Sequence, residues 1–143
     1  MDNLYALSGK NMVVSGASSG LGRATTCLLA NLGANVILVG RDEGRLQPVL
    51  SEISETPGHH RLSQCDFSEP ETIPGWLKGL SKELGSISGV AHAAGAHCAM
   101  PVKLLSPEHI ERTLRLNVTA GMMMARGLMQ RGVPDPDGAG IVF

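Results

Sequence analysis

The sequence predicts an α/β fold: a doubly wound, mostly parallel sheet with helices on both faces, formed by residues 1–143 as one domain. Short apolar runs of strand length alternate with segments whose apolar residues recur at helical spacing. Several glycines mark the junction of the first run and the first helical segment. Right-handed crossovers between successive strands would place all of them in one parallel sheet.

The first strand–helix unit covers residues 11–33. Residues 11–16 (NMVVSG) are apolar, partly β-branched and end in glycine, which is typical of a buried strand. The next segment predicts a helix that ends before Gly33. We expect its inner face to consist of the apolar residues Leu21, Ala24, Leu28 and Leu32.

The second unit begins with residues 35–40 (NVILVG), which predict another buried strand. The helix that follows carries the apolar residues Leu46, Val49, Leu50 and Ile53. Pro48 lies among them, so this helix either begins near Gln47 or is kinked.

The third unit and the fourth strand come next. Residues 59–67 predict a weaker strand, and a helix after Pro74 ends before Gly85. Its apolar residues are Trp76, Leu77, Leu80 and Leu84. Residues 87–95 predict the fourth strand.

The last third predicts one long helix and the opening of a fifth strand. After a loop over residues 96–106, Ser106 is expected to cap the helix, with Pro107 at its first position. Residues 134–140 are rich in turn formers, and residues 141–143 (IVF) begin the fifth strand. We expect an exposed apolar edge there.

Composition and charge exclude several classes of function. Apolar residues make up 43% and charged residues 17% of the chain, and the net charge is −1 with the basic residues scattered. This distribution predicts no binding to nucleic acid or membranes. The N-terminal residues resemble no secretory signal, and Cys27, Cys65 and Cys98 form no C-x-x-C pair. We therefore expect a cytoplasmic location with reduced thiols.

Gly16, Gly20 and Gly22 lie between the first strand and the first helix. In this position the first glycine allows a tight turn, the second lets the backbone approach a ligand, and the third lets helix and sheet pack closely. The N–H groups at the helix start suit a diphosphate, although a purely structural turn is the alternative. The same loop supplies the candidate binding residues Ser18, Ser19 and Leu21.

The spacing Gly-x3-Gly-x-Gly resembles the signature of the short-chain dehydrogenase/reductase family in its ordinary, non-extended form. The signature of that family is Thr-Gly-x3-Gly-x-Gly, and Ser15 stands in place of the threonine here. The resemblance runs from about Lys10 to the last residue and implies a Rossmann-type domain that binds a nicotinamide dinucleotide.

Residues at the end of the second strand favour NADP over NAD. An acid there would bind the ribose 2′-OH of NAD, but this chain has Gly40 followed by Arg41. A guanidinium matches a 2′-phosphate well. Alternatively, Arg41 is a solvated surface residue and Asp42 binds NAD, although we expect Asp42 to cap the next helix. Many NADP-preferring relatives have a basic residue where this chain has Ser19.

Residues at the ends of strands three and four extend the candidate site. The resemblance implies that Asp66 binds the adenine amino group, with the Phe67 backbone beside it; a helix cap is the alternative for Asp66. It also implies that the backbone of Ala93, Ala94 and Gly95 passes close to a ribose. The family's Asn-Asn-Ala-Gly is His-Ala-Ala-Gly here, so His92 either replaces an asparagine contact or is a core histidine. We expect no metal site at His92 and His97.

Asn117 interrupts an apolar helical stripe. The stripe consists of Ile110, Leu114, Asn117, Gly121, Met124 and Leu128. A buried amide is costly unless it is hydrogen-bonded. The resemblance implies that Asn117 kinks the helix and holds a water of the catalytic proton relay; a buried structural asparagine is the alternative. In many relatives this helix forms dimer contacts, so we expect a homo-oligomer of the full-length protein.

The family's proton-transfer pair, Tyr-x3-Lys, is absent from these residues. The single tyrosine, Tyr5, precedes the first strand and has Gly9 four positions later. In the family a catalytic serine follows strand five, and Tyr-x3-Lys comes soon after it. We therefore expect the cofactor-binding front part of an NADP(H)-dependent oxidoreductase, inactive alone.

The expected substrate is a small carbonyl compound or alcohol, such as a 3-oxoacyl thioester or a related ketone. One alternative is a non-catalytic module that binds a dinucleotide as a sensor or scaffold. Another is a methyltransferase-like domain, which would have a different glycine spacing and an acid at the end of strand two.

Overall fold

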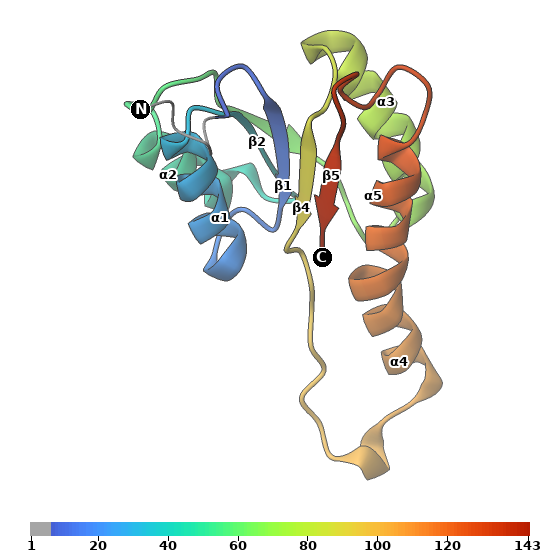
Figure 1. Cartoon of the computed structure of the whole chain (residues 1–143). Coiled ribbons are helices and arrows are strands. Elements are labelled where there is room, and N and C mark those ends of the chain that lie inside the picture. Colours follow the sequence, from blue (N-terminus) through green and yellow to red (C-terminus); the bar gives the residue numbers. More distant parts are fainter. Residues whose placement is uncertain (1–6) are drawn as a thin grey trace.

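Five parallel strands form one sheet in the order β3-β2-β1-β4-β5 in the computed structural model, which describes residues 7–143 (Figure 1). The first four lie within the runs predicted for them, the fifth begins one residue before its predicted run, and the doubly wound α/β class is confirmed. The strands are β1 (Asn11–Ser15), β2 (Asn35–Gly40), β3 (Arg61–Gln64), β4 (Gly89–His92) and β5 (Gly140–Val142).

Helices cover both faces of the sheet (Figure 1). On one side lie α1 (Gly20–Asn31) and α2 (Glu43–Glu52). On the other lie α3 (Ile73–Leu84) and a long helix made of α4 (Pro107–Leu114), a π-helical segment η3 (Arg115–Thr119) and α5 (Ala120–Leu128). Short 3-10 turns occur at η1 (Pro70–Thr72) and η2 (Val102–Leu104). No helix in residues 7–143 is both long and apolar enough to span a bilayer.

The apolar strands are buried on both faces. Val13 of β1 lies in a cluster with residues of α3 and α5, whereas its neighbour Val14 lies in a second cluster with residues of α1 and α2. The same alternation separates Ile37 from Leu38 in β2. Because successive side chains of a strand point to opposite faces, a continuous apolar run fills both clusters.

The buried face of α1 differs from the predicted one. Leu21 is 83% exposed and Leu28 61% exposed, while Gly22, Thr26 and Ala30 face the sheet. A Cβ at Gly22 would lie 2.1 Å from the Gly16 carbonyl oxygen, so the helix passes very close to the preceding loop. Only small residues fit at this contact, and Leu21 and Leu28 consequently point outward.

Helix α2 begins earlier than the start near Gln47 that Pro48 suggested. The Asp42 carboxylate accepts the Arg45 N–H at 3.3 Å and caps the helix, as expected of Asp42. The helix then runs through Pro48. Pro48 is exposed, so water can bind the carbonyl that its missing N–H leaves free.

The predicted stripe of the long helix divides into two parts. Ser106 caps α4 as expected, in a capping box with His109. Gly121 and Met124 of α5 are buried, but Ile110 is 45% and Leu114 52% exposed. Helix α4 extends beyond the sheet (Figure 1), and η3 shifts the helical register between the two parts.

Candidate dinucleotide-binding site

A cavity of about 720 Å³ lies where the strand order reverses, between β1 and β4. In open α/β sheets, ligands bind at such a point beyond the carboxyl ends of the strands. Its walls are residues 16 and 18–21 of the glycine loop, residues 40–42 after β2, Phe67, and residues 93–95 after β4. The fold thus brings most of the predicted binding residues together.

The three glycines have different surroundings. Gly16, at φ +65°, lies so close to β4 that a Cβ would be 2.8 Å from the Ala93 carbonyl oxygen. Gly20, at φ +54°, has no atom of residues 7–143 within 4 Å of its Cβ position, apart from its chain neighbours and the adjacent helix backbone, and it lines the cavity. Gly16 therefore allows two loops to meet, whereas Gly20 leaves its backbone open to a ligand.

The start of α1 fits a negatively charged group. Ser19 is the N-cap residue, but its side chain makes no capping hydrogen bond, and the first turn has no acidic residue. The N–H groups of this turn therefore lack a side-chain partner, and the positive end of the helix dipole lies at the same place. A diphosphate fits this arrangement of donors beside Gly20.

Ser15 and His92 connect the two central loops. The Ser15 hydroxyl accepts the Ala94 N–H at 3.0 Å and lies 2.8 Å from His92 Nδ1. Its own proton is then free to be donated, so we assign Nδ1 as the acceptor and place the imidazole proton on Nε2. Ser15 and His92 thereby fix the backbone that borders the cavity.

His92 is only 8% exposed and lies edge-on to Phe67 and Phe143, with ring centroids 5.6 and 6.4 Å away. Burial lowers its pKa, which the nearby Leu116 backbone partly opposes. Nε2 nevertheless has no hydrogen-bond partner of good geometry within residues 7–143. His92 thus combines both roles considered from the sequence, an inter-strand contact and a core ring.

Two arginines line the cavity where β2 ends. Arg41 was expected there, and Arg45, in the first turn of α2, also lines the cavity. Asp42 also lines the cavity, but its carboxylate caps α2. Arg45 was not among the residues predicted to bind the cofactor, although the helix that carries it starts at the expected cap, Asp42. Its place in the first turn after that cap, close to the end of β2, is the signal that could have identified it.

Asp66 lies beside the main cavity, in a smaller one of about 250 Å³ that Arg41 also lines. Its Oδ1 accepts the Ser68 N–H at 2.9 Å and the Ser68 hydroxyl at 2.7 Å. These bonds, with a smaller contribution from Arg41, lower the pKa of Asp66. Oδ2 forms no hydrogen bond with any residue in the described range 7–143, so it is available to a ligand.

Asn117 holds the segment that leaves β4. Its Oδ1 accepts the Ala96 N–H at 2.8 Å, and its Nδ2 donates to the Ala96 carbonyl at 2.7 Å. It lies in η3, where the Ala120 N–H bonds to the Arg115 carbonyl five residues back. Asn117 is exposed rather than buried, and it does not line the cavity. Tyr5 lies outside the described residues.

Residues 10–143 match the model of the family described as short chain dehydrogenase. The chain belongs to this family. The resemblance seen in the glycine spacing is thereby confirmed, and so is the Rossmann-type fold.

Three similar proteins illustrate the relationship. A fatty acyl-CoA reductase of Mycobacterium tuberculosis is 33% identical over 124 residues, which is 85% of this chain and 42% of that protein. The structure of a citronellol catabolism dehydrogenase from Pseudomonas aeruginosa has a TM-score of 0.81 and 31% identity, covering 92% of this chain and 54% of the other. A metagenomic short-chain oxidoreductase in complex with NADP has a TM-score of 0.79 and 30% identity, covering 85% and 56%. The chain therefore spans about half the length of these relatives.

Proposed function

We propose that this chain is the NADP(H)-binding part of an oxidoreductase that transfers hydride between the nicotinamide and a small carbonyl compound or alcohol. The observation that carries the proposal is the pair Arg41 and Arg45 on a cavity that also contains the glycine loop. Guanidinium groups at this end of β2 suit the 2′-phosphate that distinguishes NADP from NAD. The complex of the metagenomic relative with NADP supports the assignment.

Each wall of the cavity has a proposed part in binding. The N–H groups at the start of α1 hold the diphosphate, and Asp66 and the Phe67 backbone receive the adenine. The backbone of residues 93–95 lies along a ribose. NADP, when bound, supplies the hydride chemistry, and the chain orients it. Asn117, fixed by Ala96, is proposed to hold a water for proton transfer.

Turnover is proposed for the full-length protein and not for residues 1–143, which contain no Tyr-x3-Lys. Residues 1–143 are proposed to form one cofactor domain that binds NADP weakly and is inactive alone. The substrate class includes 3-oxoacyl thioesters and related ketones, and the fatty acyl-CoA reductase among the relatives supports a thioester. Measuring NADPH oxidation by the full-length protein in the presence of such compounds tests the proposed substrate class. Binding without any turnover would instead indicate a dinucleotide sensor.

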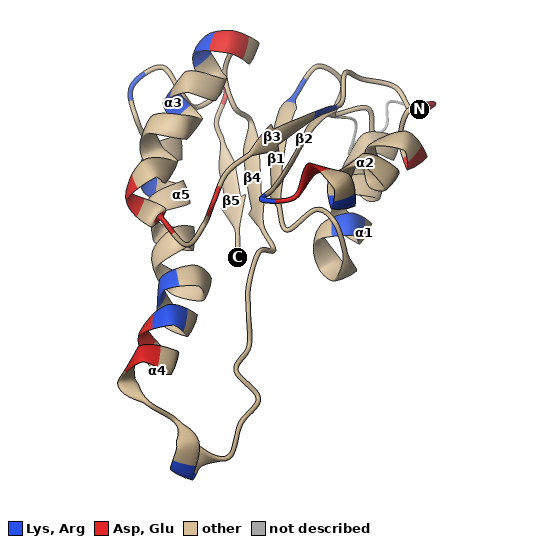
Figure 2. Cartoon of the chain, turned by 180° about the vertical axis from the view of Figure 1, so that it is seen from behind, with Lys and Arg blue, Asp and Glu red and all other residues tan. Residues whose placement is uncertain are grey.

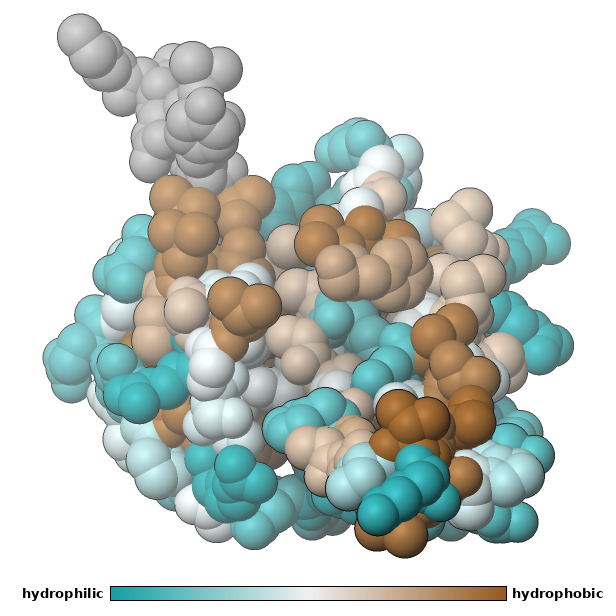
Figure 3. Space-filling view, turned by 90° about the horizontal axis from the view of Figure 1, so that it is seen from below, coloured by the Kyte–Doolittle hydropathy of each residue, from teal (hydrophilic) through white to brown (hydrophobic). Residues whose placement is uncertain are grey.

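A homo-oligomer is proposed from the long helix. Ile110, Leu114, Val118 and Met122 follow one another at intervals of four and are all exposed. Figure 3 views the end of the molecule to which α4 extends and shows apolar side chains at its surface. A second copy could cover this stripe. The cytoplasm is the proposed location, where free Cys27, Cys65 and Cys98 stay reduced.

Titration of NADPH and NADH against arginine variants tests the cofactor assignment. We expect Arg41→Ala and Arg45→Ala each to weaken NADPH binding about tenfold, the loss of one charged hydrogen bond, and to leave NADH binding unchanged. Arg126→Ala is the matched control, since Arg126 is exposed on α5 and pairs with no acidic side chain within residues 7–143. Equal losses for NADPH and NADH would contradict NADP preference.

A further inference from the structure

Arg115 joins the long helix to the turn that follows β3. Its Nε donates to the Ser68 carbonyl at 2.8 Å, and its Nη2 donates to both carboxylate oxygens of Glu71, at 2.8 and 2.7 Å. These partners lie 47 and 44 residues away along the chain. Figure 2 shows the acidic residues between β3 and α3 beside basic residues of the long helix.

The turn held by Arg115 is the one that orients Asp66. Ser68 gives its carbonyl to Arg115, while its N–H and hydroxyl both bind Asp66 Oδ1. Four residues thus form one connected series, Glu71–Arg115–Ser68–Asp66, which passes through the backbone carbonyl of Ser68. The series fixes one oxygen of Asp66 and leaves Oδ2 for a ligand.

The geometry separates this contact from an ordinary surface ion pair. An exposed pair contributes little because two long side chains must be ordered for one screened attraction. Here a single guanidinium makes three hydrogen bonds, and one of them is to a backbone carbonyl. Arg115 is also the first residue of η3, so these bonds join the start of the π-helical segment to the β3 turn.

We infer that Arg115 is a positioning residue for adenine recognition, acting through Ser68 on Asp66. The inference rests on the proposed function, because it assigns the adenine to Asp66. It predicts that Arg115 contributes to affinity for the adenine half of the cofactor and contributes nothing to affinity for the nicotinamide half.

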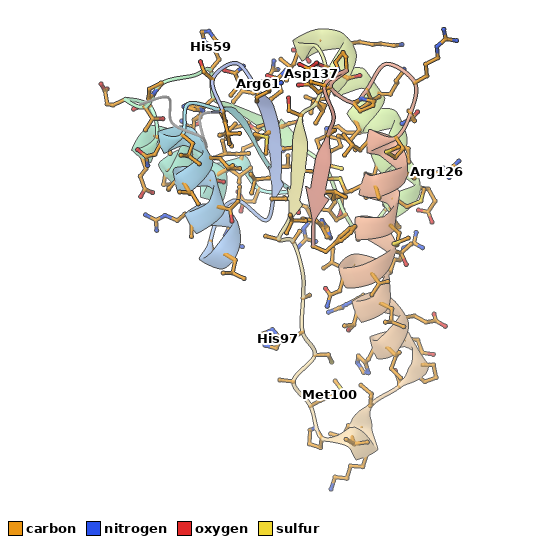
Figure 4. All side chains as sticks on the ribbon, viewed as in Figure 1. His59, Arg61, His97, Met100, Arg126 and Asp137 are labelled. Carbon is orange, nitrogen blue, oxygen red and sulfur yellow. The ribbon has the colours of Figure 1, made fainter. Side chains whose placement is uncertain are left out.

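The test measures binding of 2′,5′-ADP and of reduced nicotinamide mononucleotide to the full-length protein. We expect Arg115→Ala to weaken 2′,5′-ADP binding about tenfold, which corresponds to the loss of one charged hydrogen bond. Binding of the mononucleotide should stay unchanged. Glu71→Gln keeps the Ser68 bond, so its effect should be smaller. Arg126→Ala is the control, because Arg126 projects away from α5 (Figure 4) and should behave as the unmodified protein.

Amide hydrogen exchange of Ser68, measured without ligand, separates this inference from the proposed function. The Ser68 N–H should exchange about tenfold faster in Arg115→Ala than in Arg126→Ala, because its turn is released. If the unmodified protein bound no 2′,5′-ADP, the proposed function would be wrong. In that case, equal exchange rates of the Ser68 N–H in the two variants would overturn the Arg115 inference as well. Where 2′,5′-ADP does bind, equal affinity of the two variants, or an equal loss for both half-ligands, overturns it.

Discussion

Gly20→Ala separates backbone strain from obstruction of the ligand. Gly20 has φ +54°, a left-handed conformation that an alanine adopts at a cost of about 1–2 kcal/mol. Apart from its chain neighbours and the adjacent backbone of α1, no atom of residues 7–143 lies within 4 Å of the position a Cβ would take, so the methyl group meets no other part of the described protein. The melting temperature should therefore fall by only about 3–8 °C.

Gly9→Ala is the matched control for that variant. Gly9 has φ +74°, and its Cβ position is equally open. It precedes β1 and does not line the cavity. The two substitutions should consequently reduce stability by similar amounts, and only Gly20→Ala places a methyl group where a diphosphate would approach the backbone.

The assay compares thermal unfolding and NADPH affinity of the two variants. We expect Gly20→Ala to bind NADPH about 10–100-fold more weakly than Gly9→Ala, which corresponds to one charged hydrogen bond made by the loop. Equal NADPH affinity of the two variants would refute the assignment of the diphosphate to this loop. A much larger loss of stability in Gly20→Ala would show that the residue has a packing role instead.

Two further predictions concern stability and thiol reactivity. Hydrogen bonds from Ser88 and Lys10 lower the pKa of Asp135 from 3.8 to about 2. The ionised carboxylate therefore stabilises the fold above about pH 4, and this stabilisation is lost as the pH falls from about 4 to about 2. Asp135→Asn should lower the melting temperature at neutral pH and flatten its decline across that interval; unchanged melting curves would contradict this. Burial raises the pKa of the Cys65 thiol to about 11, whereas Cys98 is exposed. Mass spectrometry after brief iodoacetamide treatment at pH 8 should therefore find Cys98 alkylated well before Cys65. The reverse order of alkylation would contradict the burial of Cys65.

The strands were predictable because a strand that is buried on both faces has a continuous run of apolar residues in the sequence. Residues 35–40 form β2 over the whole predicted run, and a glycine ends it. The weaker run at residues 59–67 gave a strand of only four residues, Arg61–Gln64, whose burial is incomplete. The cofactor loop was predictable for a related reason, since Gly16 and Gly20 need conformations or contacts that side chains would prevent.

The orientation of α1 was not predictable from apolar periodicity. Its leucines form an evident stripe, yet the helix turns Gly22, Thr26 and Ala30 toward the sheet. The deciding quantity is the distance between helix and loop, which requires small residues at the contact. A periodicity rule assumes that the largest apolar residues are buried, and this assumption fails wherever two backbones meet as closely as they do at Gly22.

The contacts of Asn117 and Arg115 mark the limit of inference from local pattern. An amide that is expected to be buried requires a partner; Asn117 is exposed, yet its amide oxygen and nitrogen both bond to Ala96, 21 residues away. Nothing in the local pattern identifies Ala96, because the partner depends on how the π-helical segment rotates the side chain. An arginine on an exposed helix gives no signal at all, although Arg115 reaches Ser68 from the same segment. Residues that hold a site together through distant backbone groups therefore become visible only once the helical register is known.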